Sequence, residues 1–142
     1  MSYKLFELQL NTKFESRARV LIDIKLQNNA HKDYYLSSDV IFQDGITSDK
    51  IEISGPSNIK CKIYNMNYQP EYISIKSHSM INSTINLSDI CDFTDAKSGH
   101  YIIKFSTLVV PCGLPNYEDC DVDLVMQAVG ELNIQELGQN LF

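Results

Sequence analysis

The stretch "NLSDICDFTDAKSGHYIIKF", residues 86–105, decides the fold. An apolar run ends in a corner rich in Asp, Ser and Thr, and then the sequence Gly-x-Tyr opens an alternating strand. Gly99 permits a sharp entry into that strand, and Tyr101 is expected to point inward. Short polar side chains in such a corner bond backbone groups that no sheet satisfies. We therefore expect a crossover between two sheets, stabilised by Ser88, Asp89, Asp92, Thr94 and Asp95.

Two local details of this corner are predicted. A tyrosine at such a position can form a hydrogen bond with upstream backbone, as in the tyrosine corner of immunoglobulin-like sandwiches. The alternative is a core tyrosine whose hydroxyl has an incidental partner. Residues 87–93 also fit one helical turn, with Ser88 as its cap.

Alternation of apolar and polar residues extends outward from this corner in both directions. It is clearest in residues 6–10, 20–26 and 101–105. Further strand candidates are residues 35–42, 51–53, 61–64, 72–75, 81–87, 122–128 (with Val122, Leu124, Met126 and Ala128 on one face) and 132–134. Such short strands between turn signals predict an all-β, immunoglobulin-like β-sandwich of about 7–9 antiparallel strands. We expect one domain over residues 1–142.

Charge and hydropathy exclude some partners. The chain has 142 residues and a formal net charge of −6, with no Lys/Arg cluster to offset that charge. This balance argues against nucleic acid and anionic membrane as partners, and no apolar run is long enough to span a bilayer. The N-terminus does not resemble a signal peptide, which predicts a cytoplasmic protein. The alternative is that a leader has been removed, in which case Met1 would be artificial.

The four cysteines stand at positions 61, 91, 112 and 120, without a CxxC motif. Their spacing excludes zinc-knuckle and thioredoxin-like sites. For a cytosolic protein we expect buried free thiols. A disulfide between Cys112 and Cys120, which flank a loop, is the alternative.

Residues of about 18–110 resemble a known domain. The carriers are "ARVLIDIKLQNN" (residues 18–29), where a strand runs into an Asn turn, and "INLSDICDFTDAKSGHYIIKF" (residues 85–105). They resemble the non-catalytic, immunoglobulin-like β domain of deuterolysin-type and lysine-specific metallo-endopeptidases, although Cys91 stands where that family has an aromatic residue. The closing strand is more loosely similar to bacterial intracellular proteinase inhibitors. The resemblance implies the fold and an association with a protease.

Motifs for catalysis are missing from the sequence. It has no HExxH, no GxSxG and no glycine-rich phosphate loop. His31, His78 and His100 each stand alone in the sequence, which favours surface or corner roles over a metal triad. We therefore predict a protein that is not an enzyme, with no catalytic residues, no cofactor and no metal site.

Asp119, Asp121 and Asp123 alternate in "EDCDVD" (residues 118–123). On a strand they would project from one face and discourage edge pairing. The alternative is a Ca²⁺ site completed by loop carbonyls, although the Gly and Glu of an EF-hand loop are missing.

The most unusual surface candidate is "VVPCGLPNYEDC", residues 109–120. Proline stiffening lowers the entropy lost when a loop is bound. The candidate partner-binding residues are Leu114, Pro115, Asn116 and Tyr117, and the alternative is a plain connection between strands. We predict a non-enzymatic protein-binding module that is protease-associated or a protease inhibitor. The runner-up is a structural or adhesive module that self-assembles as a homo-oligomer.

Overall fold

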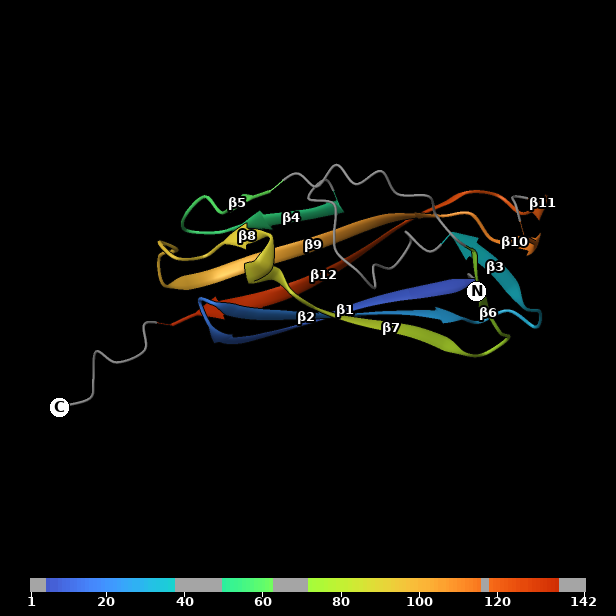
Figure 1. Ribbon diagram of the computed structural model, residues 1–142, viewed down its shortest axis with the longest axis horizontal. Helices are drawn as coiled ribbons and strands as arrows, with labels where there is room; N and C mark the ends of the chain where they lie inside the picture. The colour runs from blue at the N-terminus through green and yellow to red at the C-terminus, as the bar shows by residue number, and fades with distance from the viewer. Residues whose placement is uncertain (1–4, 38–49, 63–71, 116–117, 136–142) are drawn as a thin grey trace, which may run out of the picture.

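The computed structural model describes residues 5–37, 50–62, 72–115 and 118–135 (Figure 1). These residues form twelve β-strands and one short 3₁₀ helix, η2. The first six strands are β1 (Phe6–Ser16), β2 (Arg19–Asn28), β3 (Tyr34–Ser37), β4 (Ile51–Ser54), β5 (Lys60–Cys61) and β6 (Tyr72–Ile75). The other elements are β7 (Met80–Asn86), η2 (Leu87–Asp89), β8 (Cys91–Asp92), β9 (Gly99–Val109), β10 (Cys112–Leu114), β11 (Glu118–Cys120) and β12 (Leu124–Ile134).

The strands pair in four small antiparallel sheets. The β1-β2-β7 sheet and the β12-β9-β4 sheet contain the longest strands and are called the two large sheets below. They lie one above the other along the long axis in Figure 1. A third sheet has the order β11-β10-β3-β6, and β5 pairs with β8 alone. The prediction of an all-β antiparallel protein is confirmed, with more strands than the 7–9 expected. Four strands, β1, β2, β9 and β12, are 10 or 11 residues long, and several others have only two to four residues.

The buried apolar residues form one core cluster, to which both large sheets and the β11-β10-β3-β6 sheet contribute. On β2 the side chains at alternate positions are buried, and on β9 the same holds for Tyr101, Ile103 and Phe105. The buried residues of β2 are Val20, Ile22, Ile24, Leu26 and Asn28. Period-two patterning therefore predicted which face of these strands would be buried.

Tyr101 closes the corner that the sequence singled out. Its side chain is fully buried, and its hydroxyl donates a 2.7 Å hydrogen bond to the carbonyl of Lys97, four residues upstream. The same hydroxyl lies 2.5 Å from Ser57 Oγ. Gly55 packs on the ring so closely that a Cβ at this position would overlap it. The hydrogen bond from Tyr101 to upstream backbone, predicted from the sequence, is confirmed.

The entry into β9 is as tight as expected. Gly99 has a φ of 143°, a backbone conformation that residues with a side chain rarely adopt. A Cβ there would also lie 2.8 Å from Cγ of Pro56. Glycine is therefore required at position 99 both for the backbone conformation and for the close contact with Pro56, in the turn that follows β4.

The cap of η2 differs from the prediction. Asn86, not Ser88, is the N-cap, and its Oδ1 accepts a hydrogen bond from Ser88 N–H. Ser88 instead reaches across to the β1–β2 turn, where its hydroxyl donates to the carbonyl of Arg17. Both side-chain oxygens also lie 3.2 Å from Val20 N. Ser88 lies inside η2, whereas Asn86 directly precedes its first residue, so Asn86 occupies the capping position.

Asp92 also supports the corner. Its Oδ1 accepts a 2.9 Å hydrogen bond from Thr94 N–H. Hydrogen bonds from the side chain and backbone of Thr94 hold the pKa of this carboxyl below its ordinary value. Of the residues predicted to satisfy backbone groups here, Ser88 and Asp92 do so.

The expectation of free thiols is wrong. Cys61 and Cys91 form a disulfide between the paired strands β5 and β8, and Cys112 and Cys120 form a second one. The first disulfide links the corner covalently, through Cys91, to a segment 30 residues earlier. The prediction of a single domain over residues 1–142 stays a prediction.

Candidate functional site

A disulfide-closed hairpin, β10 and β11 with the turn between them, extends from one end of the molecule (Figure 1). Cys112 lies opposite Cys120, and Leu114 lies opposite Glu118. The Cys112–Cys120 disulfide therefore joins directly facing residues of the antiparallel pair. The hairpin contains the loop that the sequence marked as the recognition element.

Hydrogen bonds fix the base of this hairpin. Asp121 N–H donates to the carbonyl of Pro111 at 2.8 Å, which continues the pairing beyond the disulfide. The carboxylate of Asp121 accepts a 2.8 Å hydrogen bond from the Tyr34 hydroxyl on β3. Cys112 is also paired with Tyr35 of β3. The hairpin is thus held by a covalent bond, a ladder and a side-chain contact.

Gly113 and Asp119 face each other within the hairpin. A Cβ on Gly113 would overlap the carboxylate of Asp119, so a larger residue here would require that side chain to move. Asp119 itself has a φ of 54°, a conformation that Asp tolerates better than most residues. The hairpin backbone is therefore determined locally as well as by its disulfide.

The predicted binding residues lie at the tip. Leu114 is 50% exposed and Pro115 is exposed in the turn that follows β10. Asn116 and Tyr117 lie outside the described residues. The structure therefore places the two described candidates side by side on the surface of a fixed hairpin.

Exposed apolar side chains continue from the hairpin onto the neighbouring sheet. Leu108 of β9 and Val125 of β12 lie directly opposite each other and are 50% and 76% exposed. Val122, in the link between β11 and β12, is 80% exposed. The sequence predicted Val122 on the same strand face as Leu124 and Met126. Val122 instead lies before β12 begins, so the alternation of that strand does not determine where its side chain points. The hairpin root and tip together present an apolar surface.

The three aspartates are not gathered around a common point in the structure. β11 ends at Cys120, so Asp121 and Asp123 lie outside any strand, and all three side chains are exposed. Within the described ranges, no group of three or more His, Cys, Asp or Glu side chains gathers around a common point. Asp121 serves instead as the acceptor for Tyr34.

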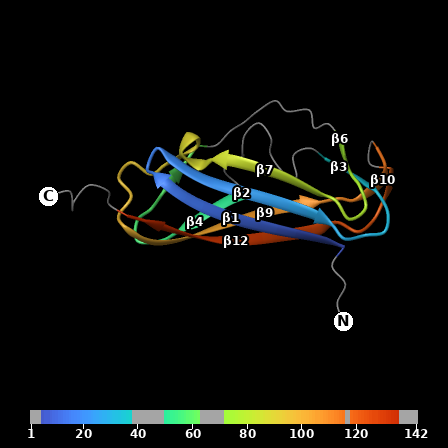
Figure 2. The same ribbon diagram turned by 90° about the horizontal axis from the view of Figure 1, so that it is seen from below.

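A second candidate site is a groove of about 650 Å³ between β1 and β12. Figure 2 shows these strands side by side, pointing the same way. The Thr12 hydroxyl donates to the carbonyl of Glu131 at the closed end. Toward the other end the strands separate, and the groove is lined by Leu5, Phe6, Glu7, Leu8, Gln9, Leu124, Val125, Met126 and Gln127.

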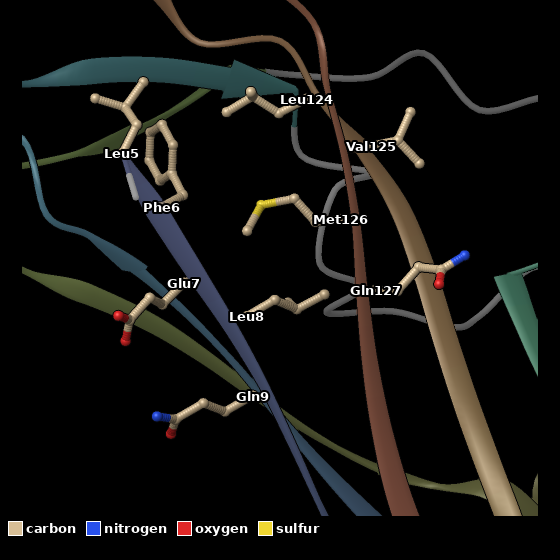
Figure 3. A pocket seen from close by; sticks show the side chains of 9 residues that line it. All are labelled: Leu5, Phe6, Glu7, Leu8, Gln9, Leu124, Val125, Met126 and Gln127. Carbon is tan, nitrogen blue, oxygen red and sulfur yellow. The ribbon is translucent and has the colours of Figure 1, made fainter. Parts of the chain in front are cut away.

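The floor of this groove is apolar. In Figure 3 the side chains of Leu8 and Met126 point toward one another across the gap, whereas Glu7 and Gln9 point away from it. In the described pairing, β1 is bonded to β2 and β12 to β9, so the groove separates two sheet edges. Sequence reasoning missed this groove because strand alternation does not say which edges face each other.

No protein-family model matches the chain, and no curated protein shows significant similarity to it. Among the described residues, no helix is long and apolar enough to cross a membrane.

Proposed function

We propose that the chain is a non-enzymatic protein-binding module whose recognition element is the disulfide-closed hairpin, β10 and β11. The observation that carries this proposal is the covalent closure of the hairpin beneath an exposed apolar tip, Leu114 and Pro115. A loop that is already ordered loses little entropy on binding. Apolar anchors on such a loop are the residue type that concentrates binding energy at protein interfaces.

We further propose an immunoglobulin-like β-sandwich as the fold. The two large antiparallel sheets share a core, and Tyr101 bonds to upstream backbone, as tyrosine corners do. The resemblance to the non-catalytic domain of metallo-endopeptidases favours a protease as the partner. On this proposal the hairpin associates with a protease or inhibits it.

A specific observation favours a second candidate function, self-association. Two sheet edges, β1 and β12, border the groove that contains Leu8 and Met126. Unpaired edges can accept a further strand. A homo-oligomer built by strand addition at this groove is the structural or adhesive alternative.

The compartment is also a proposal. Disulfides persist in oxidising compartments and are rare in the cytosol. The two disulfides therefore favour the alternative in which a leader has been removed over the cytoplasmic prediction.

The test is affinity capture from a lysate of the source cells with the oxidised chain as bait. Recovery of a protease by the native chain, and its loss with Leu114→Ala, supports hairpin recognition. Ile102→Ala is the matched control, because Ile102 is also an exposed apolar residue but lies near the start of β9, away from the hairpin. Recovery of the chain alone supports self-association. A protease retained equally by both variants contradicts a role for Leu114.

A further inference from the structure

Two histidines that are far apart in the sequence meet at the surface. His31 lies in the connection between β2 and β3, and His78 lies in the turn between β6 and β7. Nδ1 of His31 and Nε2 of His78 lie within hydrogen-bond distance, 3.3 Å apart, and the ring centroids are separated by 5.1 Å. Both side chains are exposed, so their outer faces are open to solvent.

A buried asparagine holds both turns in place. Asn28 is fully buried, and its Nδ2 donates to the carbonyls of Lys32 and Ile75, each at 3.0 Å. Its Oδ1 accepts from Ala30 N–H at 2.9 Å, and its backbone N–H donates to the carbonyl of Ser79. One side chain thus connects the segment that carries His31 to the segment that carries His78.

Ser77 adds two further bonds between the same turns. Its N–H donates to Asp33 Oδ1 at 2.8 Å, and its hydroxyl donates to the carbonyl of Ala30 at 2.5 Å. Asp33 and Ala30 flank the His31 segment, and Ser77 directly precedes His78. The two turns that carry the imidazoles are therefore held together by a hydrogen-bonded frame, which is the kind of support that favours a preorganised site.

His78 occupies an unusual backbone conformation. Its φ is 60°, a region in which non-glycine residues are uncommon, although His, Asn and Asp enter it more often than others. The turn itself would be satisfied by Gly or Asn at this position. In this conformation the His78 ring meets the His31 ring edge-on, with 70° between the ring planes.

We propose that His31 and His78 form a two-histidine site for a divalent transition metal of the zinc type. In a tetrahedral complex with zinc–nitrogen bonds of about 2.0–2.1 Å, two ligand nitrogens lie about 3.3–3.4 Å apart. The observed 3.3 Å between the ring nitrogens matches that separation. Each neutral imidazole would carry its hydrogen on the other ring nitrogen and offer a lone pair to the ion.

The other coordination positions are assigned to water or to a partner. Among the described residues, no third His, Cys, Asp or Glu joins this pair to form a closed protein cage. Imidazole ligands suit Zn²⁺, Ni²⁺ and Cu²⁺, whereas Ca²⁺ and Mg²⁺ prefer oxygen. A bound ion would join the β2–β3 connection to the β6–β7 turn.

The small number of other metal-binding side chains allows zinc binding at this site to be distinguished from binding elsewhere in the chain. The sequence has three histidines, and the third, His100, is bonded to Asn133 on β12. All four cysteines are in disulfides, so no thiolate competes for the ion. His100 therefore provides a matched control for the pair.

The experiment is calorimetric titration of the oxidised full chain with ZnCl₂ at neutral pH, with thermal melting in the presence and absence of the ion. The variants are His31→Asn, His78→Asn and the control His100→Asn. Asn at position 78 tolerates the left-handed backbone, so this variant is expected to fold normally.

The native chain is expected to bind one ion and to melt at a higher temperature when zinc is present, because a ligand of the folded state stabilises it. His31→Asn and His78→Asn should each weaken binding at least about tenfold, as expected when a metal ligand is lost. His100→Asn should bind as the native chain does. Absence of binding by the native chain, or binding that survives both pair variants, would overturn the proposal.

Discussion

The two disulfides are the same chemical device used in two different surroundings. Cys61–Cys91 lies beside the corner that ends at Tyr101, where Cys91 is buried and the neighbouring polar groups are bonded inward. Cys112–Cys120 closes a hairpin whose tip carries Leu114 half exposed to solvent. The first bond supports the core, whereas the second orders a surface. The comparison shows that the structural role of a disulfide depends on the residues that surround it.

The corner is bound to several parts of the chain at once. Ser88 reaches the β1–β2 turn, and Arg17 of that turn donates to the carbonyl of Ala96 at 3.0 Å. Tyr101 reaches Ser57 in the turn that follows β4. The hairpin, by contrast, contacts the body through its base, where Asp121 meets Tyr34. Changes in the corner should therefore alter folding, and changes at the hairpin tip should alter binding.

The largest expected effect is at the corner. Tyr101→Ala should lower the free energy of unfolding by about 3–5 kcal/mol, because a fully buried aromatic ring is lost. Tyr101→Phe keeps the ring but leaves the Lys97 carbonyl without its donor, which should cost about 1–3 kcal/mol. Urea denaturation of both variants measures these values. A loss below about 1 kcal/mol for the alanine variant is incompatible with Tyr101 as a core residue.

The next effect compares the two disulfides directly. The sequence separations of 30 and 8 residues imply that replacing each pair with alanine removes about 3.6 kcal/mol for Cys61–Cys91 and about 2.5 kcal/mol for Cys112–Cys120. Urea denaturation of the two double variants checks the order. Thiol labelling of the native chain under denaturing conditions should find no reactive cysteine. An inverted order would contradict the ranking that loop-closure entropy gives to the two bonds.

Local features of the fold were predictable from sequence, whereas long-range ones were not. Gly99 and Tyr101 belong to one short stretch, so turn chemistry and alternation sufficed to place them. Cys61 and Cys91 are 30 residues apart, and nothing in their spacing says that β5 and β8 pair. The expectation of reduced thiols failed because it rested on an inferred compartment.

The same limit explains the candidate sites. Leu114 was identified because proline, glycine and cysteine mark residues 109–120 as an unusual loop. His31 and His78 each stood alone in the sequence because 47 positions separate them, and only the frame around Asn28 brings them together. Val122 escaped its predicted face because it lies in the link before β12 begins. Sequence patterns describe faces of strands, and sites depend on which strands and turns become neighbours.

The corner is expected to determine folding, and the hairpin tip is expected to determine binding. The most direct test of this division is a pair of measurements on the double variant Leu114→Ala, Tyr117→Ala. Its melting temperature and its affinity for the captured partner are measured together. The account predicts an almost unchanged melting temperature, since Leu114 is half exposed and exposed positions contribute little to folding. It predicts binding weaker by more than about 2 kcal/mol, as for interface anchors. Unchanged binding at unchanged stability would contradict hairpin recognition and direct attention to the groove between β1 and β12.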